Sequence, residues 1–424
     1  MTLARFGIPS KATVLHCSRF LLRREEFPAP DFLTTDCTDD ADKGSNNSDH
    51  PRHLRLGSFA PRWLRLRRAV TFSLLLLACT CAVLTGRSAA ATPDIASIEK
   101  IDVHAHIFED LPPLMAFMRA NNIRAINVCN NGTDGHLATM HRIALELYRK
   151  HPDVLWFTST FDLLRRNEPT YAAEVIAHLG RTFDQGAVGV KVWKEIGMEI
   201  KRPDGTFILP DDPLFDPIYA FIAERGRPLH AHLAEPIEAW LPLNPESVSY
   251  NYYKGNPEWH LYNKPEYPSH AALIAARDNI LRKHPKLVMV AAHLGSLEHD
   301  LDAIAERFEQ YPNFNIECAA RVRYLTRHPT EKVRDFFIKY QDRILYGVDM
   351  SWKPYRTRRP TDAMRQAYIL RREERYRSDF AYFAGSGETT YEGRKVQALA
   401  LPREVLEKFY SGNARRIYRL GAGM

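Results

Sequence analysis

From residue 97 onward, short apolar runs alternate with segments that carry apolar residues at helical spacing. Two of these helical segments are TYAAEVIAHLGRTFDQ and HAALIAARDNILRKHP. The eight apolar runs are KIDVHAH, IRAINVCN, VLWFTSTFD, GVKVWK, PLHAHLAEP, LVMVAAHLGS, FNIECAAR and ILYGVDMS. Regular strand–helix alternation predicts parallel strands, and eight repeats favour a closed (β/α)8 TIM barrel over an open doubly wound sheet. A nucleotide-binding open sheet would require a glycine-rich phosphate loop after the first run, and the sequence has none there.

Polar side chains gather at the carboxyl ends of the expected strands, where a barrel of this kind carries its chemistry. Because side chains alternate along a strand, His104 and His106 are expected to face the same way, with Asp102 lower on the same face. Imidazole and carboxylate groups are common ligands of zinc-like ions. Further candidates at strand ends are Lys191 in the fourth run, His232 in the fifth, His293 in the sixth and Asp349 in the eighth.

The motifs at these strand ends resemble the amidohydrolase superfamily, in its amidohydrolase-related branch. The resemblance rests on DVHAH, GVKVWK, PLHAHLAEP, AAHLGS, LYGVDMS and the closing LEKFYSGNARRIYRL, and it predicts a barrel domain over residues 97–420. His230 does not align with a ligand and is expected in the barrel core. The resemblance implies a divalent metal, with Zn²⁺ the expected ion, held by His104, His106, His232 and Asp349.

The resemblance also implies a reaction. In the main interpretation, a metal-activated water hydrolyses an amide, a lactone or another ester of a small molecule. Asp349 then accepts the proton of the water, and His293 orients the nucleophile or stabilises the developing oxyanion.

Two other interpretations stay open. The branch also contains nonoxidative decarboxylases of aromatic or conjugated acids, and there Arg321 at the end of the seventh strand would hold the carboxylate, unless it pairs with Glu298 instead. Glu317 is expected to be a partner within the barrel. In the third interpretation the barrel only binds a metal or ligand, since a fold does not fix a function, but the intact ligand set argues against it.

Lys191 has two interpretations of its own. In two-metal amidohydrolases a carboxylated lysine in the fourth strand bridges the metals, and His232 and His293 would then hold the second ion. In one-metal members, Lys191 would pair with a substrate carboxylate or with Asp349. We expect one metal rather than two, because members of this branch usually use one.

Two long segments interrupt the alternation: WLPLNPESVSYNYYKGNPEWHLYNKPEYP after the fifth strand, and residues 352–395 after the eighth. Loops of this length in a compact domain are usually lids or binding walls. Trp193 is the aromatic candidate for substrate binding. Other candidates for an aromatic pocket wall are Trp240, Tyr253, Trp259, His260 and Trp352, although all six side chains would equally serve to pack the loops onto the barrel rim.

The first 91 residues look unlike the rest. Residues 1–60 include TTDCTDDADKGSNNSDH, which lacks apolar periodicity, so we expect either no fixed structure there or a true start codon further downstream. Residues 61–91 run from arginines through AVTFSLLLLACTCAVL to GRSAAA, the layout of a secretory signal cleaved near Ala90 or Ala91. A membrane anchor over residues 69–86 is the alternative. The protein is therefore expected to be exported, periplasmic or extracellular.

Charge and cysteine content limit the partners. The net charge is +7, but residues 92–424 carry 45 Lys+Arg against 43 Asp+Glu, or +2. This part of the chain therefore lacks the excess of positive charge that nucleic-acid binding requires. Cys129 and Cys318 lie in separate apolar runs and are expected to be core residues rather than a disulfide. The expected partner is a small-molecule substrate, with membrane contact only through an uncleaved N-terminal segment, and association into a homo-oligomer is left open.

Overall fold

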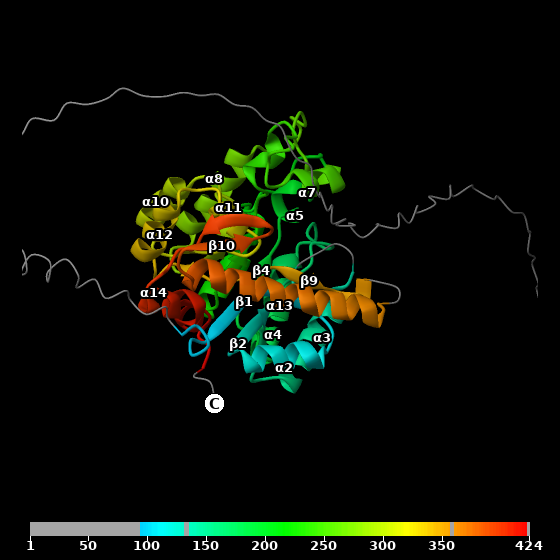
Figure 1. Cartoon of the computed structure of the whole chain (residues 1–424). Coiled ribbons are helices and arrows are strands. Elements are labelled where there is room, and N and C mark those ends of the chain that lie inside the picture. Colours follow the sequence, from blue (N-terminus) through cyan, green and yellow to red (C-terminus); the bar gives the residue numbers. More distant parts are fainter. Residues whose placement is uncertain (1–93, 131–134, 357–359, 422–424) are drawn as a thin grey trace, which may run out of the picture. The chain divides into compact units, whose positions relative to one another are not determined.

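The computed structural model describes residues 94–130, 135–356 and 360–421, which all belong to one structural unit (Figure 1). The predictions for residues 1–60 and for the signal-like segment 61–91 fall outside the described residues and stay predictions. Within the described ranges, no helix combines the length and the apolar character needed to cross a bilayer.

Eight parallel strands follow one another around a barrel, so the predicted fold is confirmed. All of them except β1 are shorter than the corresponding apolar run, because strands in a barrel tilt, and only their central residues pair on both sides. The strands are β1 (Lys100–Ile107), β2 (Ile123–Asn127), β3 (Leu155–Phe157), β4 (Val190–Val192), β5 (Leu229–Ala231), β6 (Met289–Ala291), β7 (Phe314–Glu317) and β8 (Ile344–Leu345).

Backbone contacts close the barrel at two seams. The order β3-β2-β1-β9 forms one half and β4-β5-β6-β7-β8 the other, where β9 is Met350–Trp352. A parallel bridge between Ser159 and Val190 joins the halves at one seam. At the other, the Val103 N–H donates to the Tyr346 carbonyl at 3.0 Å. The carboxyl ends of all the strands therefore open toward one mouth.

Helices surround the strands (Figure 1). Several begin where the sequence supplies a cap: the Asp300, Ser269 and Thr361 side chains accept backbone N–H bonds at the starts of α10 (Leu301–Gln310), α8 (His270–Lys283) and α13 (Asp362–Ala384). The longer helices are α2 (Pro112–Ala120), α3 (Leu137–Lys150), α4 (Tyr171–Asp184), α6 (Asp216–Glu224), α8 (His270–Lys283), α10 (Leu301–Gln310), α12 (Thr330–Lys339) and α13 (Asp362–Ala384). Shorter turns are α5 (Glu195–Met198), α7 (Tyr250–Gly255), α9 (Ala292–Gly295), α11 (Val322–Leu325), η1 (Pro213–Phe215), η2 (Ile237–Trp240), η3 (Pro257–Trp259) and η4 (Pro354–Arg356). The chain closes with α14 (Arg403–Glu407), the π-helix η5 (Lys408–Gly412) and α15 (Asn413–Tyr418).

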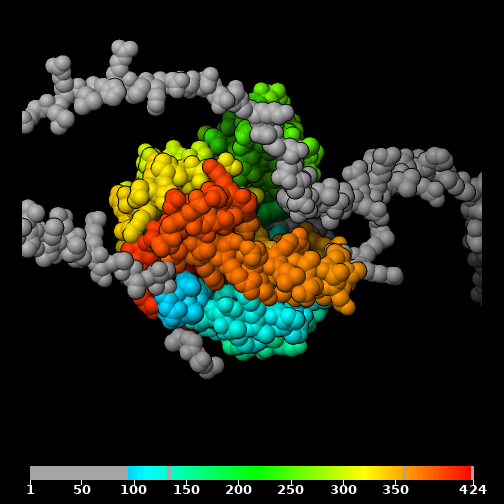
Figure 2. All heavy atoms as spheres, in the orientation of Figure 1, coloured from blue at the N-terminus to red at the C-terminus, as the bar shows by residue number. Residues whose placement is uncertain are grey.

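The prediction of a lid or binding wall for residues 352–395 holds only for the first residues of this segment, because most of the segment is a helix and a hairpin. Residues 351, 353 and 356 line the cavity described below. The rest forms the long helix α13 and a hairpin, β10 (Glu388–Tyr391) with β11 (Arg394–Gln397). Figure 2 shows α13, in orange, on the outside of the domain next to the cyan atoms of α2 and α3. Its aromatic side chains Tyr376 and Phe383 are fully buried, which holds it against the strands.

Asp102 lies on the opposite side of β1 from the two histidines, so its expected placement is wrong. Its carboxylate accepts bonds from the Arg372 guanidinium at 2.6 Å and the Tyr376 hydroxyl at 2.9 Å, both on α13. The cause is an irregularity in β1, where the pairing register with β2 shifts between Asp102 and Ala105. A bulge of this kind places one extra residue in a strand and reverses the face of the side chains that follow it.

Two smaller predictions are confirmed. Cys129 and Cys318 are buried, unbridged core residues. His230 is fully buried below the mouth, where its Nδ1 atom lies 3.1 Å from the Tyr418 hydroxyl.

Candidate metal centre and its cavity

Two histidines of β1 and one aspartate after β8 meet at the barrel mouth. The Nε2 atoms of His104 and His106 lie 3.5 and 3.4 Å from Oδ1 of Asp349. Ligand atoms of these three residues all lie within 4.8 Å of one another, which is the spacing that a shared ion requires. These three predicted ligands are therefore brought together.

The other ring nitrogens of His104 and His106 are already engaged. His104 Nδ1 lies 2.7 Å from Oε1 of Glu317, and His106 Nδ1 lies 2.8 Å from the Val128 carbonyl. With Nδ1–H donated, each Nε2 presents a lone pair toward Asp349, as metal-binding histidines do. Burial lowers the pKa of His106 to about 4 and that of His104 well below its ordinary value, so both rings are neutral at pH 7.

His232 stands apart from this group of three, beside His293. The two rings are 4.3 Å apart, centroid to centroid. His293 donates Nδ1–H to the Ala319 carbonyl at 2.8 Å, and its Nε2 lies 3.7 Å from Oδ2 of Asp349. The Nε2 atom of His232 is buried and makes no hydrogen bond with any residue that the structure describes. A buried nitrogen without a partner is rare in proteins and is expected of a metal ligand, so the donor set fits a divalent ion.

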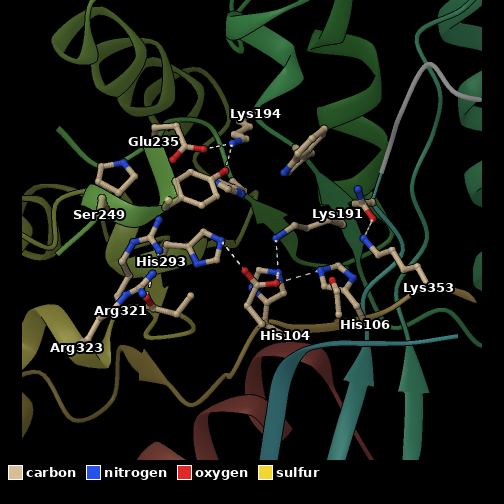
Figure 3. A pocket seen from close by; sticks show the side chains of 18 of the residues that line it. His104, His106, Lys191, Lys194, Glu235, Ser249, His293, Arg321, Arg323 and Lys353 are labelled. Carbon is tan, nitrogen blue, oxygen red and sulfur yellow. Dashed lines mark hydrogen bonds and ion pairs between the residues drawn. The ribbon is translucent and has the colours of Figure 1, made fainter. Parts of the chain in front are cut away.

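Lys191 reaches from β4 into the space between these groups (Figure 3). Its Nζ atom lies 3.3 Å from Nε2 of His104. Burial lowers the pKa of this lysine to about 8, so near neutral pH a fraction of the side chains is uncharged.

Strained backbone occurs at the same place. His293 and Asp349 have φ angles of 60° and 59°, and Leu294 and Ser296 in the same turn have 56° and 58°. Residues other than glycine adopt this left-handed region rarely, and such residues cluster at functional sites because the surrounding structure must hold them there.

Glu317 supports the centre from below, as expected of a partner within the barrel. Its Oε1 atom also accepts the backbone N–H of His293 at 3.1 Å and lies 3.4 Å from Nε2 of His230. Burial alone would raise its pKa, but the hydrogen bond with His230 and the surrounding positive charge hold the pKa of Glu317 at about 2. The carboxylate is therefore ionised and fixes the rings around it.

The centre opens into a cavity of about 290 Å³, a size suited to a small molecule. Its wall carries six positive side chains and two carboxylates, Asp349 and Glu235. Lys194 pairs with Glu235 within the wall, and Arg321 pairs with Glu298, which does not line the cavity. In Figure 3, Arg321 and Arg323 lie on one side of the histidines and Lys353 lies on the other. The six positive residues are Lys191, Lys194, Arg321, Arg323, Lys353 and Arg356.

Arg321 pairs with Glu298, as one of its two interpretations expects, while its binding of a substrate carboxylate stays a prediction. It lines the cavity, and its Nε atom lies 3.7 Å from a carboxylate oxygen of Glu298 in the wall behind it. Both side chains are buried, with Glu298 fully so. The arginine is thus held from behind while it faces the substrate space.

Among the six aromatic and histidine candidates, Trp193 alone lines the cavity, so the pocket-wall alternative fails for the other five and the packing alternative remains for them. Trp259 packs on Trp193 with ring centroids 5.7 Å apart. Trp240 donates to the Pro268 carbonyl at 3.0 Å, and Trp352 donates to Glu109 at 2.7 Å, so these indoles attach loops to the rim. The insert after β5 instead contributes Ser249 and Tyr252 to the cavity.

Sequence reasoning missed several of the positive groups. Arg323 lies in the single turn α11, Arg356 ends the short turn η4, and Lys353 lies between β9 and η4; segments this short have no periodicity that indicates which way a side chain points. Lys194 had a usable signal, because it ends the GVKVWK run, three residues beyond Lys191.

Comparison with solved structures finds chains of low similarity. The 2,6-dihydroxybenzoate decarboxylase from Rhizobium is 16% identical with a TM-score of 0.47, over 76% of this chain and 99% of that one. The 5-carboxyvanillate decarboxylase from Novosphingobium aromaticivorans, solved with manganese and 4-hydroxy-3-methoxy-5-nitrobenzoic acid, is 16% identical with a TM-score of 0.43, over 73% and 80%. A structure described as amidohydrolase II is 16% identical with a TM-score of 0.46, over 76% and 100%. At identities and TM-scores this low, these likenesses decide nothing about the reaction.

No curated protein matches the chain. The family model described as Amidohydrolase matches residues 101–420, which agrees with the six motifs and with the strand ends that carry the ligand set. Because that match covers well over half of the 424 residues, the chain belongs to the amidohydrolase family, in the amidohydrolase-related branch of its superfamily.

Proposed function

We propose that the protein is a metal-dependent enzyme that removes the carboxyl group of a small aromatic or conjugated acid as CO2, without an oxidant. The observation that carries this proposal is the charge of the cavity wall, whose lining carries six positive side chains and two carboxylates. Such a wall favours a substrate with one or more carboxylates, since a charged group leaves water at little cost only where opposite charges receive it.

One divalent ion, Zn²⁺ in our proposal, would be held by His104, His106 and Asp349, with His232 as the further ligand. When bound, such an ion supplies Lewis-acid polarisation of a substrate oxygen. Imidazole and carboxylate ligands suit Zn²⁺ and, less selectively, Mn²⁺.

The protein's own side chains bind and orient the acid. Arg321 presents a planar guanidinium that matches a carboxylate, and Glu298 behind it restricts its movement. Trp193 offers a flat apolar surface beside the same space. When the C–C bond to the carboxyl group breaks, its electron pair stays on the substrate carbon, which then takes up one proton. The proton comes from solvent water, and Nε2 of His293, 3.7 Å from Oδ2 of Asp349, is the unprotonated group placed to take it up and pass it to the carbon.

Hydrolysis of a carboxylate-bearing amide or lactone is the second candidate. It is favoured by the position of His232, which lies beside His293 and outside the group formed by His104, His106 and Asp349. Lys191 lines the same cavity, with its Nζ atom 3.3 Å from Nε2 of His104, and such a site accommodates a water and a substrate oxygen together. In this reaction Asp349 accepts the proton of the attacking water.

A substrate panel with the full chain separates the two reactions. Protein loaded with Zn²⁺ or Mn²⁺ is mixed with hydroxybenzoates and dicarboxylated phenols while CO2 release is measured, and with carboxylated lactones and N-acyl amino acids while acid release is measured. We expect CO2 release that a chelator abolishes and added metal restores. Acid release without CO2 means a hydrolase, and binding of the acids without turnover of any substrate means a barrel that only binds.

A pair of variants checks the cavity wall in the same assay. Arg321→Gln is expected to raise KM for the acid by about tenfold or more, the usual effect of losing a charge-assisted bond. Arg282→Gln is the control, since it removes an exposed arginine from α8 that does not line the cavity.

A further inference from the structure

One buried ion pair lies in the wall of the catalytic cavity, next to the insert after β5, residues 240–268. Lys194 follows β4 and Glu235 follows β5, and the two residues are only 2% and 3% exposed. In Figure 3 their side chains point toward each other. A buried pair of this kind adds little net stability, because both charges give up water, but it can fix one arrangement of the groups around it.

Three aromatic side chains of the insert contact this pair. The hydroxyl of Tyr253, which is buried, donates to Oε2 of Glu235 at 3.1 Å. Nζ of Lys194 donates to the Tyr252 hydroxyl at 3.4 Å. The same Nζ atom lies 3.4 Å from the centre of the Trp259 ring, close enough for a cation–π contact. The insert is therefore attached to both members of the ion pair.

The insert leaves much of its own apolar surface exposed. Seven large apolar side chains are exposed in the described part of the chain, and four of them belong to the insert: Leu241, Leu243, Tyr252 and Tyr262. A segment with few buried apolar contacts opens easily, so its polar attachments decide where it lies. A second attachment, between the hydroxyls of Ser249 and Tyr324, holds the start of α7. Loss of the ion pair should therefore loosen the insert without detaching it.

The position of the insert decides the shape of the substrate space. Ser249 and Tyr252 line the catalytic cavity, whereas Tyr253 and Trp259 do not. Trp259 instead packs against Trp193, the other aromatic residue of the cavity wall, with ring centroids 5.7 Å apart. A shift of the insert would therefore move Tyr252 and remove the support behind Trp193.

We propose that Lys194 and Glu235 are positioning residues, which hold the insert so that Tyr252 and Trp193 close one side of the substrate space. This inference rests on the proposed function in one respect, namely that the cavity takes a small aromatic or conjugated acid. Lys194 acts through the aromatic side chains and does not itself receive the substrate carboxylate, because Glu235 already matches its charge.

Three variants of the full-length, metal-loaded protein test this proposal: Lys194→Met, Glu235→Gln and the two combined. In each single variant we expect faster amide hydrogen exchange over residues 249–262, a measurement that needs no substrate. The dissociation constant of 2-hydroxybenzoate, measured by calorimetry, and KM for the acid turned over in the substrate panel should rise about tenfold, while kcat stays within about threefold. The combined variant should add little to either single one, because both changes act through the same pair.

Tyr253→Phe separates positioning from direct contact with the substrate. Tyr253 does not line the cavity, and its hydroxyl donates to Glu235. Loss of that hydroxyl should raise the dissociation constant of 2-hydroxybenzoate about two- to tenfold, the usual effect of one hydrogen bond. The matched control Tyr262→Phe removes an exposed hydroxyl from the same insert, at a residue that does not line the cavity, and should leave both affinity and exchange unchanged.

Two results would overturn the proposal. One is unchanged exchange over residues 249–262 in both Glu235→Gln and Tyr253→Phe, which decide even if circular dichroism shows that Lys194→Met does not fold. The other is tighter binding of the acid in Glu235→Gln together with weaker binding in Lys194→Met, since Lys194 would then receive the carboxylate itself. If no acid is turned over by the wild type, the proposed decarboxylation fails, and the exchange rates still decide whether the pair positions the insert.

Discussion

Nδ1 of His104 lies 2.7 Å from Oε1 of Glu317, across the barrel from β1 to β7. This contact fixes which nitrogen of the ring carries the proton and which one faces the metal position. It also explains why the fully buried carboxylate of Glu317 is present inside the barrel, because its ionised form orients the neutral imidazole of His104.

Glu317→Gln should therefore lower Zn²⁺ affinity about 10- to 100-fold, as the loss of such support typically does. Competition with a chromophoric chelator measures the affinity. Glu306→Gln, on the exposed side of α10, is the control and should match the wild type. Unchanged affinity in Glu317→Gln would show that Glu317 serves packing only.

His104→Ala, His106→Ala and Asp349→Asn should each abolish metal-dependent turnover while the thermal unfolding midpoint stays near that of the metal-free wild type. These residues lie at the barrel mouth and not in its packed layers. His293→Ala should keep the metal and lose about 10²- to 10⁴-fold in rate, the usual contribution of a general acid or base. Loss of metal in His293→Ala would make His293 a ligand instead.

Titration of metal-free protein with Zn²⁺ should give one tightly bound equivalent, with or without bicarbonate. His104, His106 and Asp349 bring three ligand atoms together without a bridging group. Lys191→Met should then affect only substrate affinity. A second equivalent that requires bicarbonate and disappears in Lys191→Met would mean two metals bridged by a carboxylated lysine.

Arg372→Met should destabilise the protein by about 3–5 kcal/mol, because it leaves the Asp102 carboxylate buried without its charge partner. Urea unfolding measures the loss, and Arg371→Met is the control, since that neighbour on α13 is exposed. Combining Arg372→Met with Asp102→Asn should recover part of the loss. Equal stabilities of Arg372→Met and Arg371→Met would contradict the inferred role of the pair.

Asp379 should make stability depend on pH in a region remote from the metal centre. Burial raises its pKa from 3.8 to about 6, so the folded protein keeps a proton that the unfolded chain releases. The free energy of unfolding should therefore fall by on the order of 3 kcal/mol as pH rises from about 4 to about 6. Asp379→Asn cannot titrate and should lack this component. Parallel pH profiles of Asp379→Asn and the control Asp335→Asn, which is exposed on α12, would refute the assignment.

The fold could be predicted from the sequence because each strand coincides with an apolar run, and the eight runs alternate with helical segments. The residues at the barrel mouth could be predicted for the same reason, because the carboxyl end of every strand lies at that mouth. His232 marks a limit of prediction from sequence. Its strand was predicted, but its distance from His104 and His106 depends on how two strands on different sides of the barrel tilt.

Asp102 shows a different limit. Strict alternation placed it beside His104, and a bulge in β1, which has no marker in the sequence DVHAH, reversed it. The aromatic residues of the insert failed for a third reason. Loop conformation is decided by contacts such as that of Trp240 with Pro268, which no local pattern reveals.

The pair Asp102–Arg372 has a consequence for how the chain is made. Its members are 270 positions apart, so β1, with both ligand histidines, leaves the ribosome long before the side chain that neutralises its buried carboxylate. Contacts of such long sequence separation form late in folding, and an unfinished chain exposes unpaired strands. Completion of the metal-binding strand must therefore wait for α13, and the first barrel strand to be synthesised is among the last to take its final form.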